Sequence, residues 1–481
     1  MKILFVTSHA FLLEPLGTML MSAIGRNYQH KIRLVILRRG NVVQQVDRWK
    51  PDVVAYSAMS TDMPMFRAVD KEIRKKYASN GKMPFRIMGG PHPTYSPSVI
   101  DDLQLDAICQ GDGDRAFPEL LKRLENNENL ERIPNISLTR NGAETKELYD
   151  CIDDLPFSYR EDYYRLVPYL RESGLRSFVA SRGCPYDCSY CYNHAFKGIF
   201  EGCGPILRRH SVDRLLDEIE YVIKIYPPVR LIRFGDDTFT FKVDAWLQEF
   251  ARKYKTRIKL PFYCQMRSNT LTEDTARLLS EAGCQSVSIS IESGSERIRN
   301  QILKRNLSNE KVIRSFEVAK KYKLHTFANT MLGIPGTTLE DDFESLEFSR
   351  KISPSAPAFT ICCPYPGTEI WKKAIEGGHL DENEEVETIF TELSVLKSYS
   401  QREKEIQARI CFLGPIFCFV PEFLVPFMCF LMRSRVPLRL ANRIGLTYRH
   451  YLHATRIFPQ AIPRSPGSLF RLVCDTFKVL G

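Results

Sequence analysis

The sequence predicts an α/β protein with a helical region at its C-terminal end. Short apolar runs alternate with helix-length amphipathic stretches over the first 140 residues, and the same alternation returns after residue 176. A different pattern follows residue 376, where a long apolar run precedes several arginines. We therefore expect α/β domains at 1–140 and 176–375, a linker at 141–175, and a helical C-terminal region at 376–481.

The first domain contains five apolar runs of strand length with helical patterns between them. The expected strands are Lys2–Thr7, Ile32–Leu37, Asp52–Ser57, Phe85–Gly89 and Asp106–Cys109, and the expected helices are Leu16–Gly25, Val42–Trp49 and Met63–Lys76. In open parallel sheets, ligands bind beyond the carboxyl ends of the strands. Ser57, Gly89 and Gly90 fall at such ends, so they are candidate binding residues.

The second domain repeats a strand-then-helix pattern six times. Its expected strands are Ser177–Ala180, Arg230–Phe234, Phe262–Met266, Ser286–Ile291, Thr326–Leu332 and Ala358–Cys362. A glycine-rich or polar motif follows each strand, as in α/β barrels whose sites are built from the loops at the carboxyl ends. The pattern therefore predicts a partial barrel with its site at one end.

Three cysteines follow the first of these strands in one short segment. Cys184, Cys188 and Cys191 are spaced so that their thiolates can bind one iron–sulfur cluster. A four-iron cluster held by three thiolates leaves one iron open for a ligand. A zinc site that includes His194 and a disulfide are alternatives, but zinc prefers four protein ligands and no other feature marks a secreted chain.

This segment resembles the signature of the radical S-adenosylmethionine (SAM) superfamily, Cys-x3-Cys-x2-Cys with an aromatic residue, here Tyr190, before the last cysteine. The resemblance implies that Cys184, Cys188 and Cys191 bind a [4Fe-4S] cluster and that the open iron binds SAM. It also implies a 5′-deoxyadenosyl radical and a reducing partner such as flavodoxin or ferredoxin. The six units match the partial (β/α)6 barrel of this superfamily.

The motifs after the later strands also resemble those of the superfamily. The resemblance implies that one of two adjacent aspartates binds the SAM amino group, that an Arg pairs with its carboxylate, and that other motifs lie along its ribose and adenine. Turns, caps or surface ion pairs are the structural alternatives. The residues concerned are Asp236, Asp237, Arg267, Glu292, Ser293, Gly333 and Gly336.

The first domain resembles the Rossmann-like cobalamin-binding domain that precedes many radical SAM domains. The matching pieces are Ser57-Ala58-Met59, Gly89-Gly90-Pro91-His92-Pro93 and Gly111-Asp112-Gly113-Asp114. The Asp-x-His-x-x-Gly motif that supplies an axial histidine is absent, because Thr7 and Leu12 stand near His9 where that motif has Asp and Gly. Either cobalamin binds without a histidine ligand, or the domain is purely structural.

The C-terminal region carries most of the net charge of +10. From Gln401 onward there are twelve Lys/Arg and four Asp/Glu, so this region has a net charge of +8 and the first 400 residues are nearly neutral. This distribution argues against nucleic acid as a partner of the whole protein. The basic region therefore requires a partner or a structural role of its own.

The apolar segment Ile410–Met432 contains one charged residue, Glu422. Its length would suit a transmembrane helix, but Pro415, Pro421 and Pro426 argue against a straight one. Arginines alternate with leucines after it, as expected for an anchor at the surface of an anionic membrane. A buried helical cap on the barrel and a site for an acidic partner are the alternatives.

These features together predict a cobalamin-dependent radical SAM methyltransferase that acts on an unactivated carbon of an apolar or lipid-like substrate. Radical cyclisation, ring rearrangement or C–C bond formation without methyl transfer is the alternative. No catalytic acid or base is indicated beyond the cofactor ligands. The oxygen-sensitive cluster and the lack of a cleavage site after the first apolar run favour the cytoplasm, peripheral to the inner face of the membrane.

Overall fold

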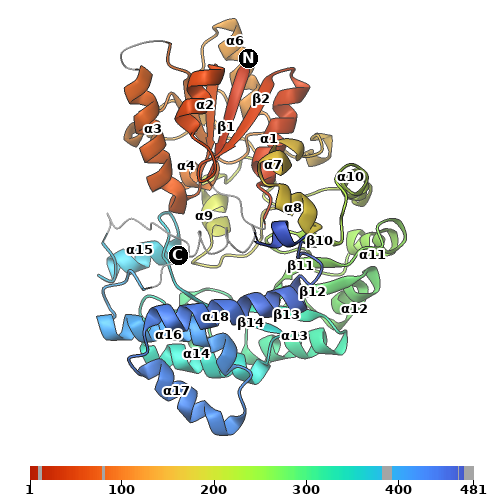
Figure 1. Ribbon diagram of the computed structural model, residues 1–481, viewed down its shortest axis with the longest axis vertical. Coiled ribbons are helices and arrows are strands. Elements are labelled where there is room, and N and C mark those ends of the chain that lie inside the picture. Colours follow the sequence, from red (N-terminus) through yellow and green to blue (C-terminus); the bar gives the residue numbers. More distant parts are fainter. Residues whose placement is uncertain (9–12, 78–81, 382–392, 464, 471–481) are drawn as a thin grey trace.

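The computed structural model describes residues 1–8, 13–77, 82–381, 393–463 and 465–470. It contains two six-stranded sheets, one in each expected α/β domain, with the C-terminal helices against the second (Figure 1). The prediction of an α/β fold is therefore confirmed. His9 and Leu12, two residues near the missing axial-histidine motif, lie outside the described residues.

The first sheet has the strand order β2-β1-β3-β4-β5-β6, and all of its pairs except β5–β6 are parallel. Its strands are β1 (Lys2–Thr7), β2 (Lys31–Ile36), β3 (Val53–Ser57), β4 (Phe85–Gly89), β5 (Ala107–Cys109) and β6 (Ile136–Ser137). Its helices are α1 (Leu16–Asn27), α2 (Val42–Trp49), α3 (Met63–Tyr77), α4 (Pro91–Tyr95), α5 (Val99–Asp102) and α6 (Ala116–Asn126). Side chains of α2, α3 and α5 pack on one face, and side chains of α1 and α6 pack on the other.

The segment between the two sheets contains short helices that pack against the second domain. These are α7 (Glu161–Leu166) and α8 (Pro168–Ser173), whose Tyr163, Tyr164 and Tyr169 belong to the core of the second domain. The expected linker is thus helical in its second half.

The second sheet is parallel throughout, with the order β14-β13-β12-β11-β10-β7. Its strands are β7 (Leu175–Phe178), β10 (Leu231–Phe234), β11 (Phe262–Met266), β12 (Cys284–Ile289), β13 (His325–Leu332) and β14 (Ala356–Ile361). The helices of this domain are α10 (Val212–Ile225), α11 (Ala245–Arg257), α12 (Glu273–Ala282), α13 (Asn309–Lys321), α14 (Leu339–Ile352) and α15 (Glu369–Glu376). Because β7 and β14 are edges, the sheet forms an open barrel.

The two faces of β13 are buried to different extents. Ala328 and Leu332 on one face are fully buried, whereas Phe327, Asn329 and Met331 on the other face remain partly exposed. Phe327 packs against Leu452 and Ile457 of the C-terminal region. The C-terminal helices therefore cover part of this face.

The free edge of β7 is covered by a residue of the first domain. The Glu14 carboxylate accepts a hydrogen bond from the Ser177 backbone N–H at 2.5 Å. It also forms a 2.7 Å ion pair with Arg160, and both side chains are buried. This contact satisfies an edge donor and joins the two domains.

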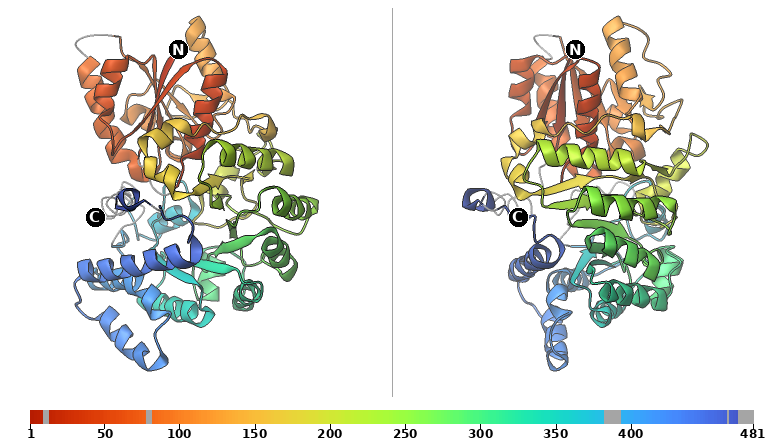
Figure 2. Two further views of the ribbon diagram at one scale, coloured as in Figure 1. Left: turned by 45° about the vertical axis from the view of Figure 1, so that its right-hand side comes forward. Right: turned by 90° about the vertical axis from the view of Figure 1, so that its right-hand side faces the viewer.

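The C-terminal helices lie across the open side of the barrel and below it (Figures 1 and 2). They are α16 (Gln401–Phe417), the single turn η4 (Glu422–Leu424), α17 (Val425–Arg433) and α18 (Leu438–Leu452), which continues into η5 (His453–Ile457). The expected apolar segment Ile410–Met432 is split, because its first part ends α16 and its last part forms α17. Ile410, Leu413 and Phe417 pack against the barrel.

Among the described residues, none of the helices has both the length and the apolar character needed to cross a bilayer. Membrane attachment of this region is not established by the fold.

Candidate active site

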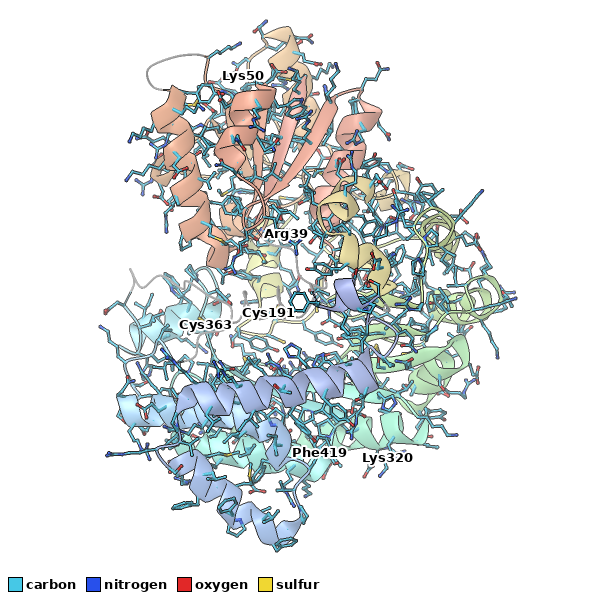
Figure 3. The ribbon with its side chains drawn as sticks, viewed as in Figure 1. Arg39, Lys50, Cys191, Lys320, Cys363 and Phe419 are labelled. Carbon is cyan, nitrogen blue, oxygen red and sulfur yellow. The ribbon has the colours of Figure 1, made fainter. Side chains whose placement is uncertain are left out.

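The three cysteines of the signature lie in the loop between the hairpin strand β8 (Ser181–Arg182) and helix α9 (Tyr192–Ile199). Cys191 is the residue immediately before α9, and Figure 3 places it between the two domains. Cys184 and Cys188 are buried. Arg267 Nη1 donates to Cys188 Sγ at 3.2 Å, and Asn193 Nδ2 donates to Cys191 Sγ at 3.7 Å.

The thiols are enclosed, and their surroundings suit sulfur ligands of a cluster. Burial raises the pKa of the Cys184 thiol, and it raises the pKa of the Cys191 thiol to about 11. Such thiols ionise only when a metal or other cationic group binds them. Three thiols in one loop beside N–H donors fit an iron–sulfur cluster, since donors to sulfur are among the interactions that tune such clusters.

His194, the alternative zinc ligand, lies beside carboxylates. His194 Nδ1 lies 3.3 Å from the Asp187 carboxylate, and His194 Nε2 lies 3.7 Å from the Glu369 carboxylate. The described contacts of the His194 ring therefore go to carboxylates and not to the cysteines.

The two adjacent aspartates after β10 have different surroundings. Asp236 is buried and accepts hydrogen bonds from the Ala180 and Ser181 backbone N–H groups at 3.1 and 2.6 Å, and from the Ser181 hydroxyl at 2.7 Å. Burial raises its pKa to about 6. The Asp237 side chain is exposed. Asp236 therefore holds the strand that leads into the cysteine loop, and Asp237 is the aspartate accessible to a ligand.

Arg267 is engaged with the cysteine loop. Its guanidinium lies 4.0 Å above the centre of the Tyr186 ring, and its Nη2 donates to the Arg305 carbonyl. Together with the contact to Cys188, these interactions use both terminal nitrogens. The structure thus places Arg267 beside the sulfur ligands, with no carboxylate among its described partners.

Glu292 belongs to a buried network that the sequence did not indicate. It accepts hydrogen bonds from Tyr190 Oη at 3.0 Å and from Arg305 Nη1 at 3.1 Å. Burial raises the pKa of the Tyr190 phenol. Glu292 has a φ of +66°, a left-handed conformation that is costly for a residue with a Cβ. No motif marked Arg305, because the partners of its side chain lie 13 or more residues away along the chain.

Ser293 and the glycine loop after β13 complete the set of expected residues. Ser293 is buried, and its hydroxyl accepts from the Ser295 N–H at 3.2 Å. The Gly333 N–H donates to the Asp342 carboxylate at 2.9 Å. Gly336 has a φ of +78° and open space around its Cα, so it is accessible to a ligand.

Ser57, Gly89 and Gly90 line a cavity of about 410 Å³ at the carboxyl edge of the first sheet. The cavity continues to Ser181 and Arg182 in the second domain, next to the cysteine loop. Gly90 has a φ of +99°, and a Cβ there would lie 2.9 Å from the Ala58 carbonyl oxygen. The cavity and the glycines that open it fit a large ligand between the domains.

His92 is engaged within the first domain. Its Nδ1 lies 3.1 Å from the Ser60 hydroxyl, and burial lowers its pKa to about 4. It is therefore neutral at physiological pH.

Charged and aromatic contacts close the junction between the domains. Arg182 pairs with both Asp112 and Asp114, and Arg208 pairs with Asp112. The rings of Tyr95 and Tyr192 stack at 4.2 Å, and Tyr365 packs on Tyr192 at 5.5 Å. These contacts hold the segments that follow β4, β5 and β14 next to the cysteine loop.

Comparisons with known proteins match two family models to separate parts of the chain. The model of the radical SAM superfamily matches residues 178–348, and the model of the B12 binding domain matches residues 3–121. An uncharacterized methyltransferase of Pyrococcus horikoshii is 28% identical over 376 residues, which cover 75% of this chain and 78% of the relative. The hopanoid C-3 methylase of Methylococcus capsulatus is 24% identical over 383 residues, 75% of this chain and 68% of the relative.

Solved structures share the fold. The radical SAM methyltransferase TsrM from Kitasatospora setae, determined with cobalamin and a [4Fe-4S] cluster bound, superimposes with a TM-score of 0.64. The match covers 78% of this chain and 75% of that one at 15% identity.

Proposed function

We propose that this chain, which belongs to the radical SAM superfamily and carries a B12 binding domain, methylates an unactivated carbon of an apolar or lipid-like small molecule. Its cofactors are a [4Fe-4S] cluster, SAM and cobalamin. When bound, the cluster and SAM supply a 5′-deoxyadenosyl radical and cobalamin supplies the methyl group. The observation that supports the proposal most directly is the cavity that extends from the glycine-lined edge of the first sheet to Ser181 and Arg182 of β8, directly before the cysteine loop.

Residues of the second domain would bind the cluster and SAM, and residues of the first domain would bind cobalamin. Cys184, Cys188 and Cys191 would bind the cluster, and Arg267 would orient Cys188 by its N–H contact at 3.2 Å. Asp237 would bind the SAM ammonium group, because the carboxylate of Asp236 already accepts three hydrogen bonds.

Backbone loops and a buried network would position the remaining groups. Gly333 and Gly336 would lie along the adenine. The network of Glu292, Arg305 and Tyr190 would hold the cysteine loop against the barrel, because Tyr190 belongs to that loop. Ser293 would hold the turn after Glu292, because its hydroxyl accepts from the Ser295 N–H. Ser57, Gly89 and Gly90 would let the corrin approach the backbone.

The proposed chemistry is tested by counting products. We expect anaerobically reconstituted enzyme with a reductant such as flavodoxin or ferredoxin to form both 5′-deoxyadenosine and S-adenosylhomocysteine. A radical cyclase would form 5′-deoxyadenosine without S-adenosylhomocysteine. The variant Cys188→Ala should lose SAM cleavage by at least about a hundredfold because one cluster ligand is missing, and Cys203→Ala is the matched control. Unchanged cleavage by Cys188→Ala would disprove the cluster assignment.

The lipid-like substrate is supported by a surface of the C-terminal region. Phe423, Phe427 and Phe430, at i, i+4 and i+7, form one stripe on η4 and α17, and their side chains are 78%, 55% and 66% exposed. Figure 2 shows α17 at the end of the molecule farthest from the first domain. The arginines that follow take part in none of the ion pairs between described residues: Arg433, Arg435, Arg439 and Arg443.

Exposed aromatic rings together with exposed arginines suit the surface of an anionic membrane, where the rings enter the headgroup region and the arginines contact phosphates. Of these arginines, Arg433 also lies 4.0 Å from the centre of the Phe343 ring. A peripheral position on the inner face of the membrane would let the enzyme meet a lipid substrate. The relative from Methylococcus capsulatus is named as a methylase of hopanoids.

Vesicle flotation tests this attachment. We expect the protein to float with vesicles of phosphatidylcholine and phosphatidylglycerol, and to float less with phosphatidylcholine alone or at high salt. The variant Phe423→Ser/Phe427→Ser/Phe430→Ser should bind at least about tenfold more weakly. Tyr28→Ser/Tyr221→Ser, which removes exposed rings elsewhere, is the control. Equal flotation of all variants, or a change only in oligomeric state, would contradict membrane docking.

A further inference from the structure

The glycine loop that follows β13 is anchored by an acid on the next helix. The Gly333 N–H donates to Asp342 Oδ1 at 2.9 Å, and Gly333 has a φ of +64°. Asp342 lies on α14 and is 3% exposed. A buried carboxylate needs further donors to be stable in its charged form. The second donor comes from outside the barrel.

Gln407 of the C-terminal helix α16 supplies that donor. Its Nε2 donates to Asp342 Oδ2 at 2.8 Å, and its side chain is fully buried. The same amide packs on Gly333, where a Cβ would lie 3.1 Å from Nε2 and 3.2 Å from Oε1. Gln407 therefore fills the place that a side chain at position 333 would occupy, and holds the carboxylate that anchors the loop.

A second residue of the C-terminal region holds the other end of the loop. The Tyr399 hydroxyl lies 3.0 Å from the Ile334 carbonyl and 3.0 Å from the Thr337 carbonyl. It also lies 2.9 Å from the Thr337 hydroxyl. Tyr399 is 5% exposed. Both ends of the segment 333–337 are thus fixed by side chains that lie beyond the barrel in the sequence.

We propose that Gln407 and Tyr399 are positioning residues for SAM: the C-terminal region completes the SAM site by holding the glycine loop in its binding conformation. The inference rests on the proposed function, in which this loop lies along the adenine. A preordered loop binds its ligand without the entropic cost of ordering. Loss of either anchor should therefore weaken SAM binding and leave the chemical step intact.

The test compares SAM binding and turnover in the cluster-loaded, cobalamin-loaded full chain. Gln407→Leu keeps the side-chain volume and removes the donor, and Tyr399→Phe removes only the hydroxyl. We expect the dissociation constant for SAM, measured by equilibrium dialysis, and the KM for SAM to rise about tenfold, the size expected for one buried hydrogen bond. The kcat for 5′-deoxyadenosine formation and the cluster absorbance should be unchanged. Gln401→Leu, the same substitution at an exposed position of α16, is the matched control.

A double-mutant cycle tests the route through Asp342. Because Gln407 acts on the loop through this acid, the KM of Asp342→Asn/Gln407→Leu should be no higher than that of the worse single variant. Additive effects would contradict the route. If SAM affinity is unchanged in both Gln407→Leu and Tyr399→Phe while the wild type cleaves SAM normally, the positioning role is wrong and the proposed function still stands. If the reconstituted wild type neither binds nor cleaves SAM, the proposed function itself fails. Should Gln407→Leu not fold, Tyr399→Phe decides.

Discussion

Asp342 is a carboxyl whose titration is displaced toward neutral pH. Its pKa is raised to about 7, chiefly by burial and also by neighbouring Asp341 and Glu340, while the N–H donors of Gly333 and Gln407 partly oppose this rise. In an unfolded chain the pKa of an Asp is about 4. Between these values the native state binds a proton that the unfolded state has released. The native state therefore loses stability as the pH rises through this interval.

We expect the variant Asp342→Asn, which does not titrate, to lack this loss. Its free energy of unfolding should increase relative to that of the wild type as the pH rises from about 4 to about 8. Urea denaturation across this range measures the difference. Parallel pH profiles for the two proteins would show that Asp342 titrates normally.

The residue types at the site were predictable, but several of their roles were not. The spacing of Cys184, Cys188 and Cys191 placed them in one loop, because residues so close in sequence have little freedom to separate. Arg267 was expected to pair with a carboxylate, and the structure places it on Cys188, 79 residues away. Such partners depend on tertiary contacts between distant segments, which local motifs do not encode.

At the scale of elements, the crossing of α16 and α18 depends on a glycine. A Cβ at Gly445 would overlap the carbonyl of Phe412 and lie 2.8 Å from its Cα. These are backbone atoms of the facing helix, so the clash cannot be relieved by rotating a side chain. The two helices can approach this closely only because position 445 has no side chain.

We expect Gly445→Ala to lower the free energy of unfolding by about 2 kcal/mol or more, since overpacking of a closed contact has costs of this size. Gly198→Ala, in a helix with open space around the residue, is the control and should be neutral or slightly stabilising. Thermal unfolding of the two variants measures both effects. Equal stability of Gly445→Ala and wild type would mean that the helices can separate.

Many of the elements followed from periodicity, but strand β6 and the linker helices α7 and α8 were not expected. The expected strands Lys2–Thr7, Phe85–Gly89 and Phe262–Met266 agree with β1, β4 and β11 at both ends. The apolar segment Ile410–Met432 was expected as one unit, and the structure divides it between a buried helix and an exposed one. Composition alone cannot separate these parts. An apolar segment has the same composition whether it packs against the barrel or against a partner outside the protein.

At the scale of the whole molecule, the two domains and the C-terminal region share one site. Arg182 of β8, directly before the cysteine loop, pairs with Asp112 and Asp114 of the first domain, and Gln407 reaches the barrel from α16. The sequence predicted the order of the parts and the class of chemistry. It did not predict that each part supplies contacts to the others, since those contacts join residues 68 and 65 positions apart.

The Glu14 contact at the edge of β7 bears on how this protein was inherited. A gene fragment that encoded the linker and the barrel without the first domain would produce a Ser177 N–H and an Arg160 guanidinium without the Glu14 carboxylate that pairs with them. Recombination that exchanged the first domain would leave the Ser177 N–H and the Arg160 guanidinium without this carboxylate, unless the new domain carried an acid at the position of Glu14. The boundary between the two domains is therefore a poor crossover point, and the pair is expected to descend as one unit.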